Sequence, residues 1–123
     1  MKFIKGSETI LVADDSEGLR NLLSLFLKEL GYKVIEAENG QIAVDKYRQH
    51  SDLISAVIMD IDMPVKNGIV AFHEIKEDHP NAIIMMITGY ISEYIDKIKE
   101  CDFMEKPFSP IELVTRMRTS IDS

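Results

Sequence analysis

Tryptophan, paired cysteines and long apolar runs are all missing from this sequence of 123 residues. Cys101 stands alone, which excludes an internal disulfide and fits the reducing environment of the cytoplasm. No apolar run approaches the length of a membrane-spanning helix, and the run in the opening segment is too short for a secretory signal. Repeats, low-complexity segments and convincing linkers are also missing, so we expect a single cytoplasmic domain over residues 1–123.

An excess of basic residues is missing as well. The chain has 14 lysines and arginines against 21 aspartates and glutamates, which gives a net charge of −7. This balance argues against direct electrostatic binding to nucleic acid or to an anionic membrane. The hydrophobic content of 46% and the charged content of 28% are ordinary for a soluble globular protein, and the length is enough to bury one core.

What the chain does have is acidic residues directly after two short apolar runs. The run Ala56–Met59 stops at Asp60, and the run Thr9–Ala13 stops at Asp14 and Asp15. Such runs are typical of strands buried on both faces in a parallel sheet, where ligands bind beyond the carboxyl ends of the strands. Three crowded carboxylates raise one another's pKa unless a cation joins them. We therefore predict that a divalent cation such as Mg²⁺, together with a lysine, offsets their charge.

The apolar and turn patterns alternate along the whole chain. Strand-like segments lie at residues 9–13, 32–37, 56–59, 82–87 and 102–105. Helical patterns lie between and after them, at residues 17–30, 41–49, 68–78 and 92–99, with a last helix capped by Ser109 that runs to Ile121. The segment 32–37 is less apolar, which favours an edge position. Five β-α units with right-handed crossovers predict an α/β fold, a doubly wound parallel sheet between two helical layers.

Several short motifs also follow these strand-like segments in a fixed order. They are the acidic pair Asp14-Asp15, Asp60 with Pro64 and Gly68 after it, Thr88, and Lys106-Pro107. With these motifs in place from Thr9 to Ile121, the chain resembles the receiver domain of two-component response regulators, the fold of the chemotaxis regulator. The resemblance implies a flavodoxin-like three-layer sandwich with five strands in the order 2-1-3-4-5.

The resemblance also implies a chemistry for the acidic residues. Asp60 would be the nucleophile that accepts a phosphoryl group from a phosphohistidine on a sensor histidine kinase or histidine phosphotransfer protein, or from a small phosphodonor. Mg²⁺ would be held by Asp15, Asp60 and the backbone carbonyl of Asp62, with Asp14 binding directly or through water. Lys106 would pair with Asp60 and later with a phosphoryl oxygen. The chain would be a phosphorelay signalling switch and not a turnover enzyme.

A switch is implied next to this site. The hydroxyl of Thr88 would donate to the arriving phosphoryl group, and Phe103 would turn into the space that Thr88 leaves. The surface of the fourth helix, fifth strand and last helix would then repack for an output protein, or for a dimer that forms on phosphorylation. Asp62 and Tyr90 would tune the access of water during slow hydrolysis. A cis bond before Pro107 is usual in this family and would hold the preceding lysine in place.

One departure from the family pattern concerns the output surface. Thr88 and Lys106 are 18 positions apart, where most receivers have about one helical turn more, roughly 3.6 residues. A Gly-Ala pair common before the fifth strand is replaced by Glu100, Cys101 and Asp102. We therefore expect a shortened fourth helix. The family's output surface, and any dimer through it, therefore does not carry over directly to this chain.

Other functions remain as alternatives. Asp60-Ile61-Asp62 matches the Asp-x-Asp core of phosphohydrolases of the haloacid-dehalogenase type, although that family places the motif after its first strand and follows it with Thr or Val, not Met63-Pro64. A flavin-binding module would share the topology, but it needs a Ser/Thr-rich phosphate loop where this chain has Asp14-Asp15. Neither the kinase nor the output protein can be named, and the chain could be a stand-alone regulator or part of a longer protein.

For some individual residues, a purely structural interpretation competes with the functional role given above. Asp14-Asp15 could be a solvated turn, Thr88 a plain strand end and Phe103 a fixed core aromatic. Cys101 is typical of a small buried apolar residue. The three histidines, His50, His73 and His79, lie at no metal-ligand spacing and are expected to be structural or exposed.

Overall fold

The computed structural model describes residues 2–123, in which a parallel sheet has the strand order β2-β1-β3-β4-β5. The strands are β1 (Thr9–Ala13), β2 (Lys33–Ala37), β3 (Ile54–Asp60), β4 (Ile84–Thr88) and β5 (Asp102–Glu105). The helices are α1 (Glu17–Glu29), α2 (Gly40–Gln49), α3 (Gly68–Asp78), α4 (Ile91–Ile98) and α5 (Pro110–Asp122), and a short 3-10 helix, η1 (Lys2–Ile4), precedes β1. The predicted fold class and strand order are confirmed.

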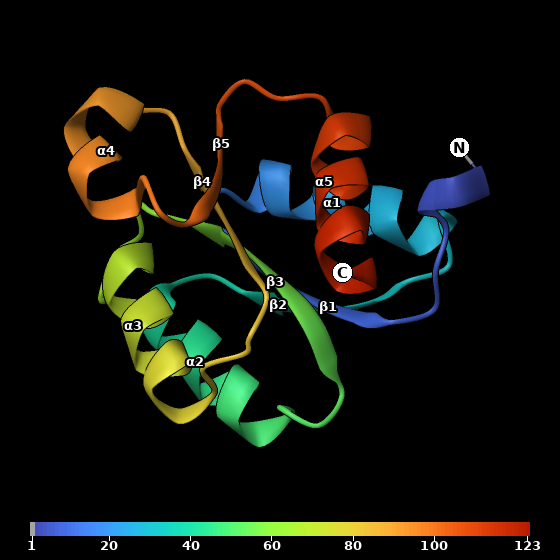
Figure 1. The fold of residues 1–123 in the computed structure, drawn as a ribbon, viewed down its shortest axis with the longest axis horizontal. Coiled ribbons are helices and arrows are strands. Elements are labelled where there is room, and N and C mark those ends of the chain that lie inside the picture. Colours follow the sequence, from blue (N-terminus) through green and yellow to red (C-terminus); the bar gives the residue numbers. More distant parts are fainter. Residues whose placement is uncertain (1) are drawn as a thin grey trace.

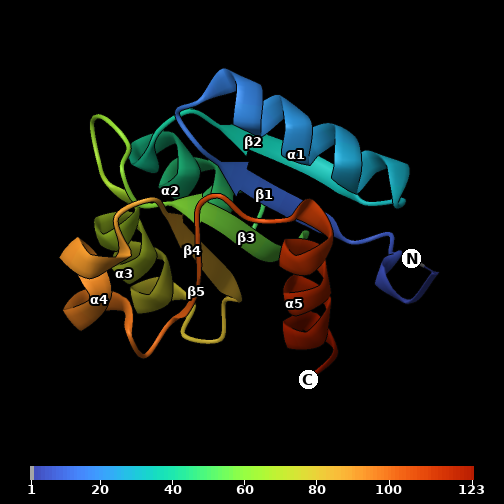
Figure 2. The same cartoon turned by 90° about the horizontal axis from the view of Figure 1, so that it is seen from above.

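The helices form a layer on each face of the sheet (Figures 1 and 2). The α1 and α5 helices cover one face, where Leu23, Leu27 and Leu113 pack against buried side chains of β1 and β3. The α2, α3 and α4 helices cover the other face, where Val44 and Ile75 belong to a second apolar cluster. Both faces of the central strands are therefore buried, which explains why these strands read as continuous apolar runs.

The strand boundaries differ from the prediction mainly at the two central strands. β3 begins two residues earlier than predicted and extends through Asp60, because its pairing with β1 starts at Ile54 and its pairing with β4 reaches Asp60. β4 begins later than predicted, since the N–H of Ala82 donates to the carbonyl of His79 in a turn at 3.0 Å. The less apolar β2 lies at an edge of the sheet, as its composition predicts.

Short polar side chains begin most of the helices. Ser16, Asn39, Asn67 and Ser109 are N-caps whose side chains accept a backbone N–H of the first turn of α1, α2, α3 and α5 respectively. At α4 the N-cap is Tyr90, which makes no side-chain cap bond within the described part of the chain. With eight residues, α4 is the shortest of the α-helices in residues 2–123. None of the helices in this range is long and apolar enough to cross a bilayer.

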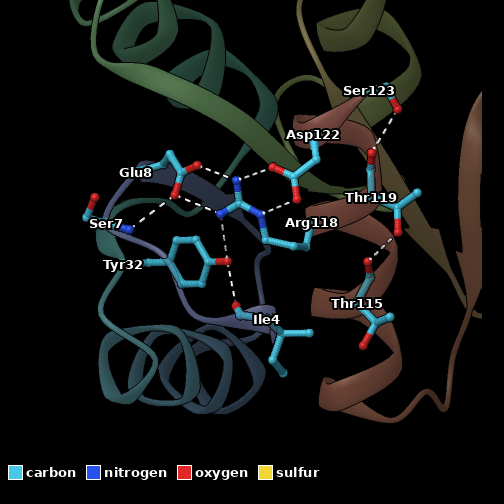
Figure 3. A network of polar contacts seen from close by, with 9 residues as sticks. All are labelled: Ile4, Ser7, Glu8, Tyr32, Thr115, Arg118, Thr119, Asp122 and Ser123. Carbon is cyan, nitrogen blue, oxygen red and sulfur yellow. Dashed lines mark hydrogen bonds and ion pairs between the residues drawn. The ribbon is translucent and has the colours of Figure 1, made fainter. Parts of the chain in front are cut away.

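A group of ionic and polar side chains joins α5 to the amino-terminal ends of β1 and β2 (Figure 3). We call Glu8, Tyr32, Arg118 and Asp122 the Arg118 cluster. The Arg118 guanidinium donates to Glu8 through Nη1 at 2.8 Å and Nη2 at 2.5 Å, and to Asp122 through Nη2 at 2.7 Å. The Tyr32 hydroxyl accepts from Arg118 at 3.2 Å and donates to the carbonyl of Ile4 at 2.6 Å. These contacts fix α5, which follows the loop that carries Lys106.

Candidate functional site

Three carboxylates gather at the carboxyl edge of the sheet. Asp14 and Asp15 follow the last residue of β1, and Asp60 is the last residue of β3, the strand beside it. Each offers one oxygen, and these oxygens lie within 4.8 Å of one another. Asp14 is 0% exposed and Asp60 is 2% exposed, whereas Asp15 faces solvent. The structure therefore brings together three of the four predicted metal ligands, two of them almost without access to water.

Main-chain contacts orient Asp14. Its N–H donates to the carbonyl of Ala37 at 3.0 Å, and its Oδ1 accepts the N–H of Ser16 at 2.8 Å. The carbonyl of Asp14 accepts a hydrogen bond from Arg20 Nη1 at 2.8 Å, and Arg20 is held in turn by Glu36 at 3.0 Å. The sequence does not predict Arg20 as a site residue, because its position in the first turns of α1 does not tell which way its side chain points.

Lys106 is the cation of the site. Its N–H donates to the carbonyl of Thr88 at 2.8 Å, and the peptide bond to Pro107 is cis. Its ammonium nitrogen lies 3.3 Å from Asp60 Oδ1 and 3.4 Å from Asp14 Oδ2. Burial alone would lower the pKa of Lys106, but the Asp60 and Asp14 carboxylates raise it above the usual value. The lysine is therefore charged at neutral pH.

One ammonium does not neutralise the carboxylates around it. Burial, followed by the charge of Asp14, raises the pKa of Asp60 from 3.8 to about 7, against the opposing effect of Lys106. Among the described residues, buried Asp14 Oδ2 accepts no hydrogen bond, and its cationic neighbour is the Lys106 ammonium at 3.4 Å, which it shares with Asp60. The three carboxylates are therefore a set of hard oxygen ligands with excess negative charge. Such a set fits Mg²⁺, which prefers carboxylate oxygens and water.

The carboxylate of Asp62 does not join this group among the described residues. Its Oδ1 instead accepts a hydrogen bond from the hydroxyl of Tyr94 in α4, at 2.5 Å. The predicted role of the Asp62 backbone carbonyl as a metal ligand stays a prediction. The sequence does not predict the contact with Tyr94, because the two residues are 32 positions apart and no pattern connects them.

The predicted switch residues lie near the site but do not contact Asp60 through any hydrogen bond found in residues 2–123. Thr88 ends β4 and is fully buried, and its hydroxyl accepts the N–H of Tyr90 at 3.0 Å. Phe103 pairs with Met86 across β4 and β5, and it is partly buried against the apolar cluster under α2, α3 and α4. Their movement on phosphorylation therefore stays a prediction.

The site opens into a shallow cavity of about 350 Å³. It is lined by Asp15, Asp60, Asp62, Gly89, Tyr90 and Lys106. Every lining residue lies at the carboxyl edge of the sheet, where it ends or follows β1, β3, β4 or β5. The volume is ample for a phosphoryl group beside Asp60.

Gly68 lets α3 begin directly against the acidic strand end. Its N–H donates to the carbonyl of Ile61 at 2.8 Å. A Cβ at this position would lie 2.1 Å from the backbone oxygen of Asp60, which is far closer than real contacts allow. Only glycine fits here without moving the backbone of Asp60.

Comparisons with known proteins agree with this geometry. Residues 10–118 match the family described as the response regulator receiver domain. The chain is 43% identical over 105 residues to the chemotaxis protein CheY of Bacillus subtilis, an alignment that covers 80% of this chain and 85% of that protein. It is 33% identical to the probable transcriptional regulator ycf27 of Guillardia theta, with 94% of this chain covered but only 46% of the relative's length.

A similar solved structure is that of the response regulator protein TrrA from Thermotoga maritima in complex with Mg²⁺ and BeF. It has a TM-score of 0.82 and 33% sequence identity, and the match covers 92% of this chain and 98% of that one.

Proposed function

The chain belongs to the response regulator receiver domains, a family of signalling domains, and on this premise we propose that it is a phosphorelay switch that accepts a phosphoryl group on Asp60. The observation that carries the proposal is the position of Asp60. It is buried at a strand end, it lies 3.3 Å from the Lys106 ammonium, and it borders an open cavity. A nucleophile in this place is shielded from bulk water yet accessible to a phosphodonor from one side.

The proposed step is transfer from a phosphohistidine to the Asp60 carboxylate. A carboxylate oxygen forms a bond to phosphorus while the bond between phosphorus and the imidazole nitrogen breaks. The electron pair of that bond returns to the imidazole, which takes up a proton, and Asp60 becomes an acyl phosphate. A small phosphodonor such as acetyl phosphate would react in the same way, with acetate leaving.

The neighbouring residues position the reactants and offset charge. The Lys106 ammonium holds Asp60 Oδ1 in the ground state and would pair with a phosphoryl oxygen afterwards. The buried hydroxyl of Thr88 would donate to another phosphoryl oxygen, which would shift the loop after β4 and release Phe103 from its present packing. The Asp14, Asp15 and Asp60 carboxylates, with the Asp62 carbonyl, would hold Mg²⁺. When bound, this ion would neutralise the excess charge of the carboxylates and of the phosphoryl oxygens.

The partners and setting follow from the same proposal. The phosphodonor would be a sensor histidine kinase or a histidine phosphotransfer protein in the cytoplasm. The output would be a protein contact through α4, β5 and α5, and a phosphorylation-dependent dimer through this surface is one form it could take. We take residues 1–123 as one receiver domain, whether it acts alone or within a longer protein.

The direct test is phosphorylation with acetyl phosphate and Mg²⁺. We expect an acid-stable, hydroxylamine-labile phosphoryl group on the wild-type protein, located on Asp60 by mass spectrometry. Asp60→Asn should remove it, and EDTA should prevent its formation. Asp78→Asn is a matched control, because Asp78 pairs with Arg48 on the surface between α2 and α3, away from the site. A phosphoryl group that persists in Asp60→Asn would overturn the assignment.

A turnover assay distinguishes the proposed switch from a phosphohydrolase. An enzyme of that kind would turn over a generic phosphoester such as p-nitrophenyl phosphate many times, whereas the switch proposed here would form one phosphoryl group per chain and lose it slowly. The Asp60-Ile61-Asp62 motif begins at the last residue of β3 and does not follow the first strand, and this position favours the switch.

A further inference from the structure

The carboxylate of Asp62 lies next to the acidic group without belonging to it. Asp62 is two residues beyond Asp60 and lines the same cavity as Asp15 and Asp60. Yet in the described part of the chain, the carboxylate oxygens that lie close enough together to hold one metal ion belong to Asp14, Asp15 and Asp60. Something therefore directs the Asp62 side chain elsewhere.

The partner that holds Asp62 is Tyr94 in α4. The Tyr94 hydroxyl donates to Asp62 Oδ1 at 2.5 Å, a short bond of the kind made to charged acceptors. The Tyr94 ring is partly buried against the apolar cluster under α2, α3 and α4, so its hydroxyl is presented from a packed position. A rigid ring with its hydroxyl aimed at one carboxylate oxygen is suited to fix the rotamer of a neighbouring aspartate.

We propose that Tyr94 is a positioning residue that keeps the Asp62 carboxylate out of the Asp14–Asp15–Asp60 group and thereby sets the affinity of the site for Mg²⁺. The inference rests on the proposed function, because it assumes that this group holds the metal. It adds a residue outside the predicted site and assigns it a measurable effect. Tyr94 itself would touch neither the metal nor the phosphoryl group.

The reason is electrostatic. Three carboxylates already outnumber the single ammonium, and a fourth would add negative charge within a few ångströms of a bound cation. Without Tyr94, the Asp62 side chain would be free to turn toward the cavity that it lines. The attraction for a divalent cation would then rise, and an increase in affinity of about fivefold corresponds to a modest Coulomb contribution near the surface.

Tyr94→Phe tests this, because it removes the hydroxyl and keeps the packed ring. The Mg²⁺ dissociation constant is measured by NMR titration of the backbone amides around Asp60, on the whole chain. We expect Mg²⁺ to bind about fivefold more tightly to Tyr94→Phe than to wild type. Tyr32→Phe is the matched control: it also removes a bonded tyrosine hydroxyl, but at the opposite edge of the sheet, and it should leave the constant unchanged.

The Asp62→Asn background distinguishes positioning from a general effect on α4. Asparagine keeps the backbone carbonyl but carries no charge, so adding Tyr94→Phe to Asp62→Asn should leave Mg²⁺ affinity unchanged. The same tightening in that background would overturn the inference, since Tyr94 would then act through its helix. A Tyr94→Phe protein that binds Mg²⁺ like wild type would also overturn it, while phosphorylation of Asp60 would still stand. A wild-type protein that neither binds Mg²⁺ nor accepts a phosphoryl group would overturn both.

Discussion

The two ends of β1 carry ionic clusters of opposite character. At the amino-terminal end, Arg118 contacts Glu8, Asp122 and Tyr32 at 3.2 Å or less. At the carboxyl end, one Lys106 ammonium is shared between Asp60 Oδ1 at 3.3 Å and Asp14 Oδ2 at 3.4 Å, and among the described residues Asp14 Oδ2 forms this ion pair without accepting a hydrogen bond.

The pKa values express the same difference. The hydrogen bonds from Arg118 lower the pKa of Glu8 from 4.5 to about 2, so its charge is favoured by folding. Burial and the charge of Asp14 raise the pKa of Asp60 to about 7, so its charge is opposed by folding. One cluster is complete within the chain and stabilises the fold. The other is incomplete, and the missing positive charge is what a metal ion would supply.

Breaking the Arg118 cluster should have the largest effect on the free energy of unfolding. Arg118→Met leaves Glu8 without its main partner and removes two contacts to Asp122. We expect the free energy of unfolding to fall by about 3 kcal/mol, the lower end of the range for a buried ion pair that loses one member, because Glu8 remains partly exposed. Urea denaturation measures it.

The control for that variant is Arg48→Met, which removes the pair between Arg48 and Asp78. Both side chains of this pair are almost half exposed, at 47% and 46%, against 13% for Arg118. Exposed pairs contribute little, so a loss below about 0.5 kcal/mol is expected. Equal losses in the two arginine variants would mean that the Arg118 cluster has no special role.

A smaller effect with a pH signature is expected from Glu8→Gln. A carboxyl group whose pKa is lower in the folded state stabilises the protein at pH values above its unfolded pKa and loses that contribution as the pH falls. Wild type should therefore exceed Glu8→Gln in stability by about 1 kcal/mol above pH 5, after allowance for solvent screening. The difference should shrink between the unfolded pKa of 4.5 and the folded value of about 2. A difference that does not change with pH would rule out the Glu8 charge as its source.

The smallest effect on Mg²⁺ affinity and stability is expected from a substitution of Arg20, which links the Asp14 loop of the carboxylate group to the rest of the fold. Arg20→Gln removes the donor to the Asp14 carbonyl and the pair with Glu36. The loop that carries Asp14 and Asp15 should become less ordered, and Mg²⁺ should bind about threefold more weakly, for a cost below about 1 kcal/mol in stability. Calorimetric titration with Mg²⁺ measures the first quantity, with Arg48→Gln as the control. If both arginine variants bind Mg²⁺ equally well, Arg20 does not position the acidic pair.

Much of the fold could be predicted because it depends on local patterns. Apolar runs identified the strands, and the side-chain caps at Ser16 and Ser109 marked helix starts that the structure shares. The strand limits were less accurate, since pairing with neighbours decides where β3 and β4 begin.

The acidic group could be anticipated for a topological reason. Asp14, Asp15, Asp60 and Lys106 each follow or end a strand, and parallel strands bring these positions to one edge without further information. The roles given to Thr88 and Phe103 depend on a movement and stay predictions.

The remaining contacts depend on side-chain directions that no periodicity encodes. Arg118 and Glu8 are 110 positions apart, and Tyr94 and Asp62 are 32 apart. Neither pair follows a helical or strand spacing, so each becomes visible only once the elements are packed.

The central claim is that the carboxylate group is left incomplete in the chain and is completed by a metal ion. Its most direct test is the free energy of unfolding of wild type and Asp60→Asn at about pH 8, each in EDTA and in saturating Mg²⁺. In EDTA, Asp60→Asn should be more stable than wild type by about 2 kcal/mol, because it removes a charge whose pKa the fold raises. Mg²⁺ should then stabilise wild type more than the variant. A wild-type protein indifferent to Mg²⁺, with Asp60→Asn less stable than wild type in EDTA, would contradict the account.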